Sequence, residues 1–310
     1  MRRGDRLGLH RRPAGNLVGS CVGASGDLCH HRRGAKFPDH LVDHRRRLVC
    51  RCAESTFARP KDSVILANQT PQAVEDTYDQ PFQREQAVPQ SPAQRRAVFV
   101  SDFDGTLARP DFYQLVRKHL VPRGTPDYWN EYRAGAMTHF DALKAFFAAA
   151  EGGESALLGM VDMMETPRDL SDHVHGLRAL GWEIVIVSAG CSWYVQELLA
   201  RAGVQLPVFA NPGRIVDGRL IMERPADPAH SCWETGIDKA AVVRVFQQQT
   251  HTVAFAGDGV PDFDAARLVP AKYRFARSDL AAACREEGVP FRPFEQWTEV
   301  TAALSQERVC

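Results

Sequence analysis

Two hydrophobic patterns alternate along residues 97–300 of the chain. Short, uninterrupted apolar runs are followed by stretches in which apolar residues recur every three or four positions. The runs are typical of strands buried on both faces, and the wider spacing is typical of helices with one buried face. Their alternation favours helices on both faces of a mainly parallel sheet, so we predict a doubly wound α/β fold. Strands are predicted over 97–102, 183–188, 207–210, 252–256 and 273–276, and helices over 171–180, 192–202, the residues around 242–246, and from 278 onward.

An antiparallel element interrupts this alternation at residues 215–222. Asp217 and Gly218 separate two apolar runs there, and an Asp-Gly pair in that setting is a strong signal for a tight hairpin. We therefore expect a β-hairpin between the third strand and the next helix.

Residues 108–168 do not fit the alternation. They are rich in alanine and leucine and are interrupted by four prolines, which predicts several short helices. We interpret this insertion as a helical cap over the carboxyl edge of the sheet. The predicted domains are an N-terminal extension of residues 1–96, a core of residues 97–107 and 169–310, and the cap of residues 108–168.

The cap is expected to set substrate specificity. Arg117 and Arg133 are candidates for binding a substrate carboxylate, and Cys191 and Trp193 of the core are candidates for walling the pocket. The alternatives are that the arginines are solvated and that Cys191 and Trp193 are buried without a function. Aromatic and methionine residues are further candidates for lining the pocket, and packing inside the cap is the alternative for them. They are Phe112, Tyr113, Trp129, Tyr132, Met137, Phe140, Met160, Met163 and Met164.

Net charge separates the first part of the chain from the rest. The 38 basic and 38 acidic residues sum to zero, but residues 1–52 carry +8, residues 53–96 carry −1 and residues 97–310 carry −7. No apolar run approaches the ~18 residues that a membrane-spanning helix needs, so a membrane partner is not expected. Eight scattered cysteines show no disulfide framework. We therefore predict a cytoplasmic protein, since thiols stay reduced there.

Residues 1–96 lack both hydrophobic patterns, and we predict a basic, disordered extension that ends in a linker. Other interpretations are a nucleic-acid-binding segment, a metal site, an organelle transit segment, or a translation start near residue 95. A solvated tail is preferred to nucleic-acid binding, because residues 1–52 are poor in the aromatic residues that stack on bases. A secretory signal is not expected, because no long apolar region follows the arginines. The residues of the metal alternative, whose spacing fits no standard zinc pattern, are Cys21, Cys29, His30, His31, Cys50 and Cys52.

Polar residues follow three of the predicted strands. They are Asp-Phe-Asp-Gly-Thr at 102–106, Ser-Ala-Gly at 188–190, and Gly-Asp-Gly-Val-Pro-Asp at 257–262, and Lys239 begins the helix before the last of these. Ligands of open parallel sheets bind beyond the carboxyl ends of the strands. If these strands are neighbours, the polar residues meet in one site.

The site so formed would hold four carboxylates, those of Asp102, Asp104, Asp258 and Asp262. Crowded carboxylates repel one another and need a dication or protons to coexist. Mg²⁺ is the natural choice, because it binds carboxylate, carbonyl, water and phosphate oxygens. A lysine and a hydroxyl beside such a site suit a phosphate monoester, so the predicted ligands are Mg²⁺ and a small phosphorylated metabolite.

These motifs resemble those of the haloacid dehalogenase superfamily of aspartate-nucleophile phosphatases, over residues 97 to about 300. The resemblance implies a Rossmann-like core with a cap, and an aspartyl-phosphate intermediate. It implies that Asp102 is the nucleophile and that Asp104 is the general acid and base. It also implies that Gly105 and Thr106 shape the turn after the first strand.

The resemblance further implies the ligands of the phosphoryl group and of the metal. Ser188, Ala189 and Lys239 would hold the phosphoryl oxygens. The Mg²⁺ ion would be bound by Asp102, by the main-chain carbonyl of Asp104, by Asp258 and, directly or through water, by Asp262.

Within the superfamily, the long helical insertion is similar to that of the phosphoserine-phosphatase-like branch. Less specific features resemble the methionine-salvage phosphatases that act on 2-hydroxy-3-keto-5-methylthiopentenyl 1-phosphate. These features are the 19-residue step from Lys239 to Asp258 and the segments 230–232, 275–277 and 284–286. Ala189 replaces a glycine that is common in related enzymes, and only Cys232 remains of a cysteine-rich stretch, so the substrate stays open.

Several other functions compete with this interpretation. Taken singly, each motif also fits an ordinary turn, a helix cap or a solvated charge. A phosphoserine phosphatase and a phosphotransferase share the first half-reaction, and a non-hydrolytic phosphate sensor or a receiver domain shares part of the residue set. Nucleic acid is not an expected partner, and the oligomeric state is left open.

Overall fold

The computed structural model describes residues 97–250 and 252–307 of the 310-residue chain. The predictions for residues 1–96, including the metal, transit and nucleic-acid alternatives, lie outside the described residues. None of the described helices is both long and apolar enough to cross a membrane.

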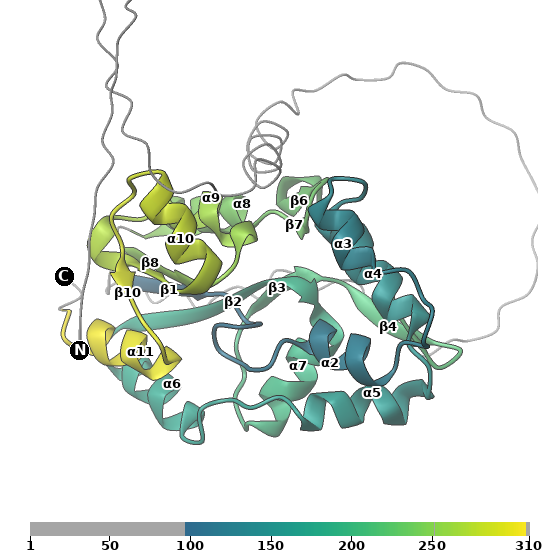
Figure 1. Ribbon diagram of the computed structural model, residues 1–310. Coiled ribbons are helices and arrows are strands. Elements are labelled where there is room, and N and C mark those ends of the chain that lie inside the picture. Colours follow the sequence, from purple (N-terminus) through teal and green to yellow (C-terminus); the bar gives the residue numbers. More distant parts are fainter. Residues whose placement is uncertain (1–96, 251, 308–310) are drawn as a thin grey trace, which may run out of the picture. The chain divides into compact units, whose positions relative to one another are not determined.

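A six-stranded parallel sheet forms the centre of the described chain (Figure 1). Its order is β10-β9-β8-β1-β2-β3, and every residue of β1 is buried because helices cover both faces. The predicted fold class, a doubly wound and mainly parallel α/β sheet, is therefore confirmed. The strands are β1 (Ala97–Ser101), β2 (Trp182–Cys191), β3 (Val208–Asn211), β8 (Val253–Gly257), β9 (Arg274–Ala276) and β10 (Arg292–Pro293).

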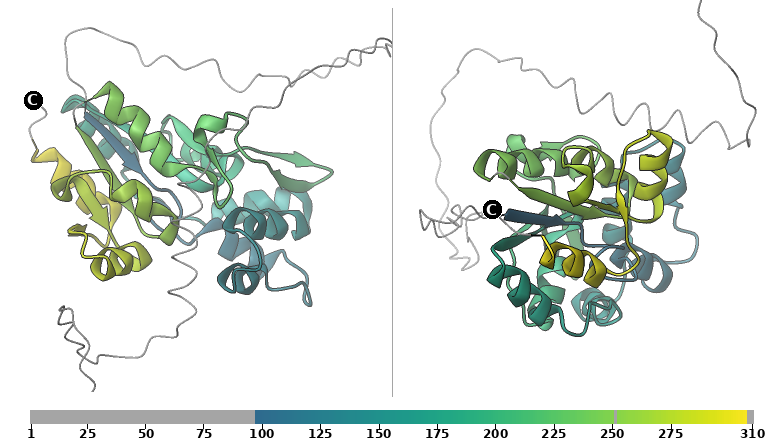
Figure 2. Two further views of the ribbon diagram at one scale, coloured as in Figure 1. Left: turned by 90° about the horizontal axis from the view of Figure 1, so that it is seen from above. Right: turned by 90° about the vertical axis from the view of Figure 1, so that its left-hand side faces the viewer.

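Two layers of helices sandwich this sheet, as the end-on view in Figure 2 shows. Side chains alternate across β1, so that Phe99 packs into one hydrophobic cluster while Val98 and Val100 pack into the other. The first cluster includes residues of α6 (Leu170–Ala179), α7 (Ser192–Arg201) and α11 (Trp297–Ser305), and the second includes residues of α8 (Lys239–Gln249), α9 (Phe263–Ala266) and α10 (Ser278–Glu286).

The insertion between β1 and α6 is helical, as its composition predicted. Its helices are short because Pro122 and Pro126 separate α2 from α3 and Pro167 precedes α6. Thr138 caps the N-terminus of α4, and its hydroxyl accepts a hydrogen bond from the main-chain N–H of Asp141. The assignment of this segment to a separate cap stays a prediction. The helices are α2 (Phe112–His119), α3 (Tyr128–Arg133), α4 (His139–Ala149) and α5 (Gly153–Asp162).

The predicted hairpin is present as β4 (Gly213–Val216) and β5 (Arg219–Met222), which pair antiparallel. Asp217 and Gly218 have φ values of 49° and 73°, the left-handed conformation that a tight two-residue turn requires. The Arg219 guanidinium donates a 2.6 Å hydrogen bond to the carbonyl of Ala148 in α4, so the hairpin ties the helical insertion to the rest of the structure.

Several further parts of the structure, including the short helix α9, lack a counterpart in the sequence prediction. Strand β10 and helix α11 follow α10, and Trp297 fixes α11 to the sheet by stacking on Phe99 and donating a 2.9 Å hydrogen bond to the Ser101 hydroxyl. A second small antiparallel pair precedes α8. Its strands are β6 (Ser231–Cys232) and β7 (Gly236–Ile237). The described residues also form three 3-10 helices, which are η1 (Pro228–His230), η2 (Val260–Asp262) and η3 (Ala271–Tyr273).

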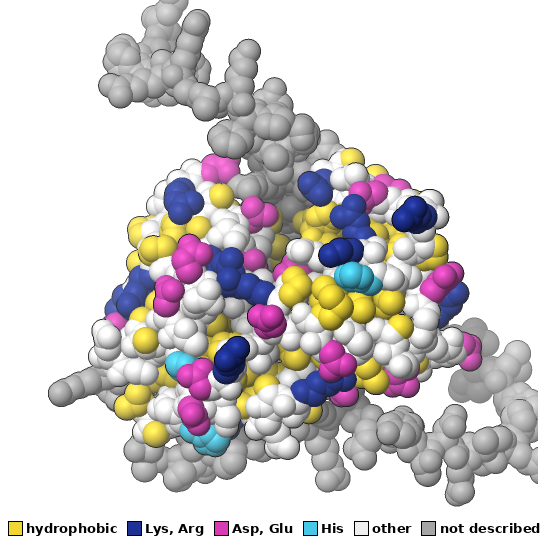
Figure 3. Space-filling model, turned by 60° about the horizontal axis from the view of Figure 1, so that its bottom comes forward, with side chains coloured by type: hydrophobic (Ala, Val, Ile, Leu, Met, Phe, Trp, Pro, Cys, Tyr) yellow, Lys and Arg dark blue, Asp and Glu magenta, His cyan; other side chains and the backbone are white. Residues whose placement is uncertain are grey.

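Charged side chains of both signs are interspersed on the face drawn in Figure 3. That face carries no continuous basic surface of the kind that tracks a nucleic-acid backbone.

Candidate active site

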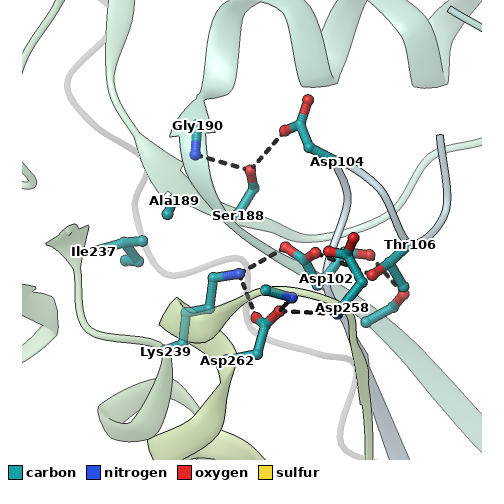
Figure 4. A network of polar contacts seen from close by, with 12 residues as sticks. Asp102, Asp104, Thr106, Ser188, Ala189, Gly190, Ile237, Lys239, Asp258 and Asp262 are labelled. Atoms are coloured by element: carbon teal, nitrogen blue, oxygen red, sulfur yellow. Dashed lines mark hydrogen bonds and ion pairs between the residues drawn. The ribbon is translucent and has the colours of Figure 1, made fainter. Parts of the chain in front are cut away.

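The three polar motifs meet because their strands are neighbours in the sheet. Strand β1 lies between β8 and β2, so the residues that follow β1 and β8 approach Ser188 of β2 (Figure 4). A pocket of about 370 Å³ opens at this edge. It is lined by all four predicted carboxylates and by Ser188, Ala189 and Lys239.

Lys239 bridges two of the carboxylates inside the pocket wall. Its Nζ donates to Oδ1 of Asp102 and to Oδ1 of Asp262, both at 2.6 Å, and all three residues are buried. Burial alone would lower the pKa of Lys239, but the two carboxylates raise it overall, so the ammonium stays charged. The position at the first residue of α8, which disfavours a cation, is tolerated because two anions face it.

Asp102, Asp258 and Asp262 form an acidic cluster, with one carboxylate oxygen of each within 4.8 Å of the others. Burial, followed by the charges of Asp102 and Asp262, raises the pKa of Asp258 to about 9. Burial and Asp262 raise the pKa of Asp102 to about 7 against the opposing effect of Lys239. Both shifts indicate that one ammonium does not balance the negative charge of the cluster.

The donor set of this cluster fits a hard divalent cation. Three carboxylates gathered at the end of parallel strands are the oxygen ligands that Mg²⁺ takes. Asp262 is the least available of them, since Oδ1 accepts from Lys239 and Oδ2 accepts from the main-chain N–H groups of Asp258 and Gly259. Asp102 and Asp258 are therefore the side chains best placed to ligate directly, and a ligand role for Asp262 fits better through a water molecule.

Asp104 lies apart from the acidic cluster and points toward Ser188 (Figure 4). Its Oδ1 accepts a 3.0 Å hydrogen bond from the main-chain N–H of Phe112. Its Oδ2 accepts from the Tyr194 hydroxyl at 2.5 Å and from the Ser188 hydroxyl at 3.3 Å. Burial raises the pKa of Asp104, while these three donors lower it.

The turn after β1 keeps these groups in place. The Thr106 hydroxyl donates a 3.0 Å hydrogen bond to Oδ2 of Asp102, and the carbonyl of Gly105 accepts a 2.6 Å hydrogen bond from the Arg277 guanidinium. Ser188 is oriented in turn by Gly190, whose main-chain N–H donates to the serine hydroxyl at 3.0 Å. The carbonyl of Ala189 accepts a 2.8 Å hydrogen bond from the Asn211 side chain.

The outer wall of the pocket comes from the helical insertion. Tyr113, Trp129, Tyr132 and Arg133 line it, as four of the predicted specificity candidates. Arg117 instead pairs with Asp127 at 2.7 Å. The predicted candidates that do not line the pocket are Phe112, Met137, Phe140, Met160, Met163, Met164, Cys191 and Trp193.

Several residues of the site were missed by the sequence analysis, and four of them make polar contacts in the site or have shifted pKa values. Tyr194 binds Asp104, Arg277 binds the turn, and Asp111 and His139 line the pocket. Burial, followed by the charge of Asp104, raises the pKa of Asp111 to about 6. Burial lowers the pKa of His139 to about 3, so its ring is neutral, and its Nδ1 has no hydrogen-bond partner among the described residues. The one sequence signal for Asp111 was its place five residues after the end of the first motif.

The chain is similar in sequence to a family of hydrolases and to a named phosphatase. Residues 99–267 match the family of haloacid dehalogenase-like hydrolases. A 2-hydroxy-3-keto-5-methylthiopentenyl-1-phosphate phosphatase of Bacillus velezensis is 26% identical over 217 residues, which cover 68% of this chain and 90% of that protein.

Two solved structures share the fold at low sequence identity. A HAD family hydrolase from Salmonella enterica serovar Typhi superposes with a TM-score of 0.54 at 16% identity, covering 70% of this chain and 74% of that one. A phosphoserine phosphatase with an analogue of its phospho-aspartyl intermediate gives 0.52 at 14% identity, covering 67% and 99%. At these identities, the likeness extends to the fold.

Proposed function

Since the chain belongs to the haloacid dehalogenase-like hydrolase family, we propose that it is a Mg²⁺-dependent phosphatase that acts on a small phosphomonoester. The observation that carries this proposal is the pocket in which Lys239 faces Asp102 beside a cluster of carboxylates. A fixed cation beside a carboxylate that lines the pocket suits attack on phosphorus, because the cation offsets the charge of the incoming phosphoryl group.

In the proposed reaction, an oxygen of the Asp102 carboxylate attacks phosphorus and forms a P–O bond as the bond to the leaving oxygen breaks. The leaving oxygen keeps the electron pair of that bond and takes a proton from Asp104. Asp104, now a carboxylate, removes a proton from water as the water oxygen attacks the aspartyl phosphate. The bond to Asp102 then breaks, and inorganic phosphate leaves.

The remaining residues bind and orient the phosphoryl group. Lys239 and the Ser188 hydroxyl are donors that line the pocket, and the main chain at Ala189 adjoins them. Asp102, Asp258 and the main-chain carbonyl of Asp104 would hold Mg²⁺, with Asp262 binding through water. A bound Mg²⁺ ion would supply positive charge that stabilises the phosphoryl group during transfer.

The substrate class follows from the pocket walls and from the named relatives. Four aromatic rings of the insertion, those of Tyr113, Trp129, Tyr132 and Phe147, and a neutral His139 suit a leaving group with an apolar part and an uncharged polar group. The phosphomonoester in the name of the Bacillus velezensis relative is our first candidate, and phosphoserine is the second, because Arg133 also lines the pocket. A panel of phosphorylated metabolites, scored by phosphate release, would rank them.

We further propose that the enzyme works in the cytoplasm. In the part of the chain that the structure describes, Cys191, Cys232 and Cys284 are free thiols, which is typical of a reducing compartment.

The decisive experiment replaces the proposed nucleophile. Asp102→Asn should reduce release of free phosphate from para-nitrophenyl phosphate to background, and Asp172→Asn, an exposed position on α6, should not. Asp104→Asn should lower kcat roughly 10²–10⁴-fold, the usual contribution of a positioned acid or base, because hydrolysis of the aspartyl phosphate needs Asp104 as the base. Full activity of Asp102→Asn would refute the proposal. Product that forms only when an acceptor alcohol is added would assign a phosphotransferase instead.

A further inference from the structure

The Asp104 carboxylate is held at both of its oxygens. The main-chain N–H of Phe112 binds Oδ1, and the hydroxyl groups of Tyr194 and Ser188 bind Oδ2. The Tyr194 contact is the shortest of the three, at 2.5 Å, and its acceptor is a carboxylate, which makes it a strong hydrogen bond.

Tyr194 is itself fixed by its surroundings. Its side chain is buried, and its ring stacks on Phe112 at a centroid distance of 4.1 Å and an interplanar angle of 16°. Phe103 and Phe147 make further ring contacts with it at 6.2 and 6.3 Å. Because Phe112 also supplies the N–H that binds Oδ1, the two anchors of Asp104 are packed against each other.

The backbone beside Tyr194 is shaped for this contact. A Cβ atom at position 190 would lie 1.7 Å from the Tyr194 hydroxyl oxygen and 3.1 Å from Oδ2 of Asp104. Only glycine at this position leaves room for the hydroxyl to reach the carboxylate. The hydrogen bond therefore depends on three separate parts of the sequence, at 104, 190 and 194.

We propose that Tyr194 is a positioning residue, which holds the Asp104 carboxyl group in the orientation from which it protonates the leaving oxygen. This inference rests on the proposed phosphatase function. Ser188 is expected to turn its hydroxyl toward the phosphoryl group when substrate binds. Tyr194 and Phe112 then remain as the two anchors of Asp104.

The proposed role predicts which substrates depend on Tyr194. When the P–O bond breaks, the electron pair goes to the leaving oxygen, and an alkoxide needs the Asp104 proton at that moment. The para-nitrophenolate ion is stable without a proton, so its release depends little on the acid. Loss of the Tyr194 hydroxyl should therefore slow alkyl phosphates and spare aryl phosphates.

The test compares Tyr194→Phe with the wild-type protein on para-nitrophenyl phosphate and on the best alkyl phosphate of the metabolite panel. The value of kcat/KM is measured, because it reports the steps up to formation of the phosphoenzyme. We expect a fall of roughly 10- to 100-fold for the alkyl phosphate, the range for a hydrogen bond to a charged group, and less than about threefold for the aryl phosphate. The matched control is Tyr273→Phe, which removes the hydroxyl of another buried tyrosine that does not line the pocket.

A double variant separates positioning from packing. If Tyr194 acts through Asp104, then Tyr194→Phe should cost nothing further in an Asp104→Asn background. Equal losses on both substrates, additive losses in the double variant, or an unchanged Tyr194→Phe enzyme would each overturn the inference. Failure of the proposed function looks different, because the wild-type protein would then release no phosphate or Asp104→Asn would be fully active.

Discussion

Replacement of Gly105 by alanine probes how closely the turn after β1 approaches the acidic cluster. Gly105 has a φ of 75°, and a Cβ atom built on it would lie 2.3 Å from Oδ2, 2.7 Å from Cγ and 2.8 Å from Oδ1 of Asp258. Contacts this short do not occur between real side chains, so either the turn or the carboxylate has to move. Both belong to the proposed site, because the turn also carries Asp104.

The size of the effect can be worked out in two parts. The left-handed conformation costs a residue with a Cβ atom about 1–2 kcal/mol of folding stability. Relief of the contact with Asp258 requires a shift of about 1 Å, and a misplacement of that size in an active site costs about 10²-fold in rate. We therefore expect Gly105→Ala to lower kcat/KM about a hundredfold and to raise the Mg²⁺ concentration needed for half-maximal activity.

Gly288 provides a matched control for the backbone contribution. Its φ is 65°, and no atom outside its chain neighbours lies within 4 Å of the Cβ position. Gly288→Ala should therefore lose about 1–2 kcal/mol in urea unfolding and keep its activity. Phosphate release over a Mg²⁺ titration, measured on both variants, separates the two contributions. Activity of Gly105→Ala equal to that of Gly288→Ala would refute the reasoning, because the contact with Asp258 would then carry no functional cost.

Two further predictions concern the charges of the site. Lys239→Met should lower the free energy of unfolding by about 3–5 kcal/mol in urea, because it leaves the buried carboxylates of Asp102 and Asp262 without their cation; a loss below about 1 kcal/mol would contradict this. Thermal melting should also show that Mg²⁺ stabilises the protein more at about pH 8.5 than at about pH 5.5. The pKa values of Asp258 and Asp102 are raised to about 9 and about 7, above those of the unfolded chain. The metal-free fold therefore loses stability as pH rises from about 4 toward 9, because these carboxyl groups have to ionise inside the fold. Bound Mg²⁺ should offset that loss. An equal shift in melting temperature at both pH values would count against a metal at these carboxylates.

The sheet was predictable because its signals are local. Strand β1 consists of four apolar residues and Ser101 and is followed by Asp102, and β8 is a similar run that is followed by Asp258. Strand adjacency was an assumption in the sequence analysis, and the order β8-β1-β2 confirms it. Strand β10 escaped prediction because it has two residues, and α11 because its anchor, Trp297, acts through contacts with β1.

The site residues that the sequence analysis missed could not be predicted, because each contacts a partner that is distant in sequence. Tyr194 lies at a helical position that also suits simple burial, and its partner Asp104 is 90 residues away. Arg277 reaches the carbonyl of Gly105 across 172 residues. Neither a sequence motif nor the hydrophobic periodicity indicates that two residues so far apart in the sequence are in contact. The aromatic residues of the insertion show the same ambiguity, since Tyr113 lines the pocket whereas Phe112 packs behind it on the same helix.

The two aspartates of the first motif are the same residue type, but their different contacts favour different roles. A nucleophile has to be an anion, and an acid has to carry a proton. Asp102 contacts the Lys239 ammonium at 2.6 Å, which favours its charged form. Among the described residues, the hydrogen-bond donors to Asp104 are all neutral: an amide and two hydroxyl groups. Lys239 forms its ion pair with Asp102 rather than with Asp104, and burial raises the pKa of Asp104, so the contacts of each carboxylate support the proposed assignment of nucleophile and acid.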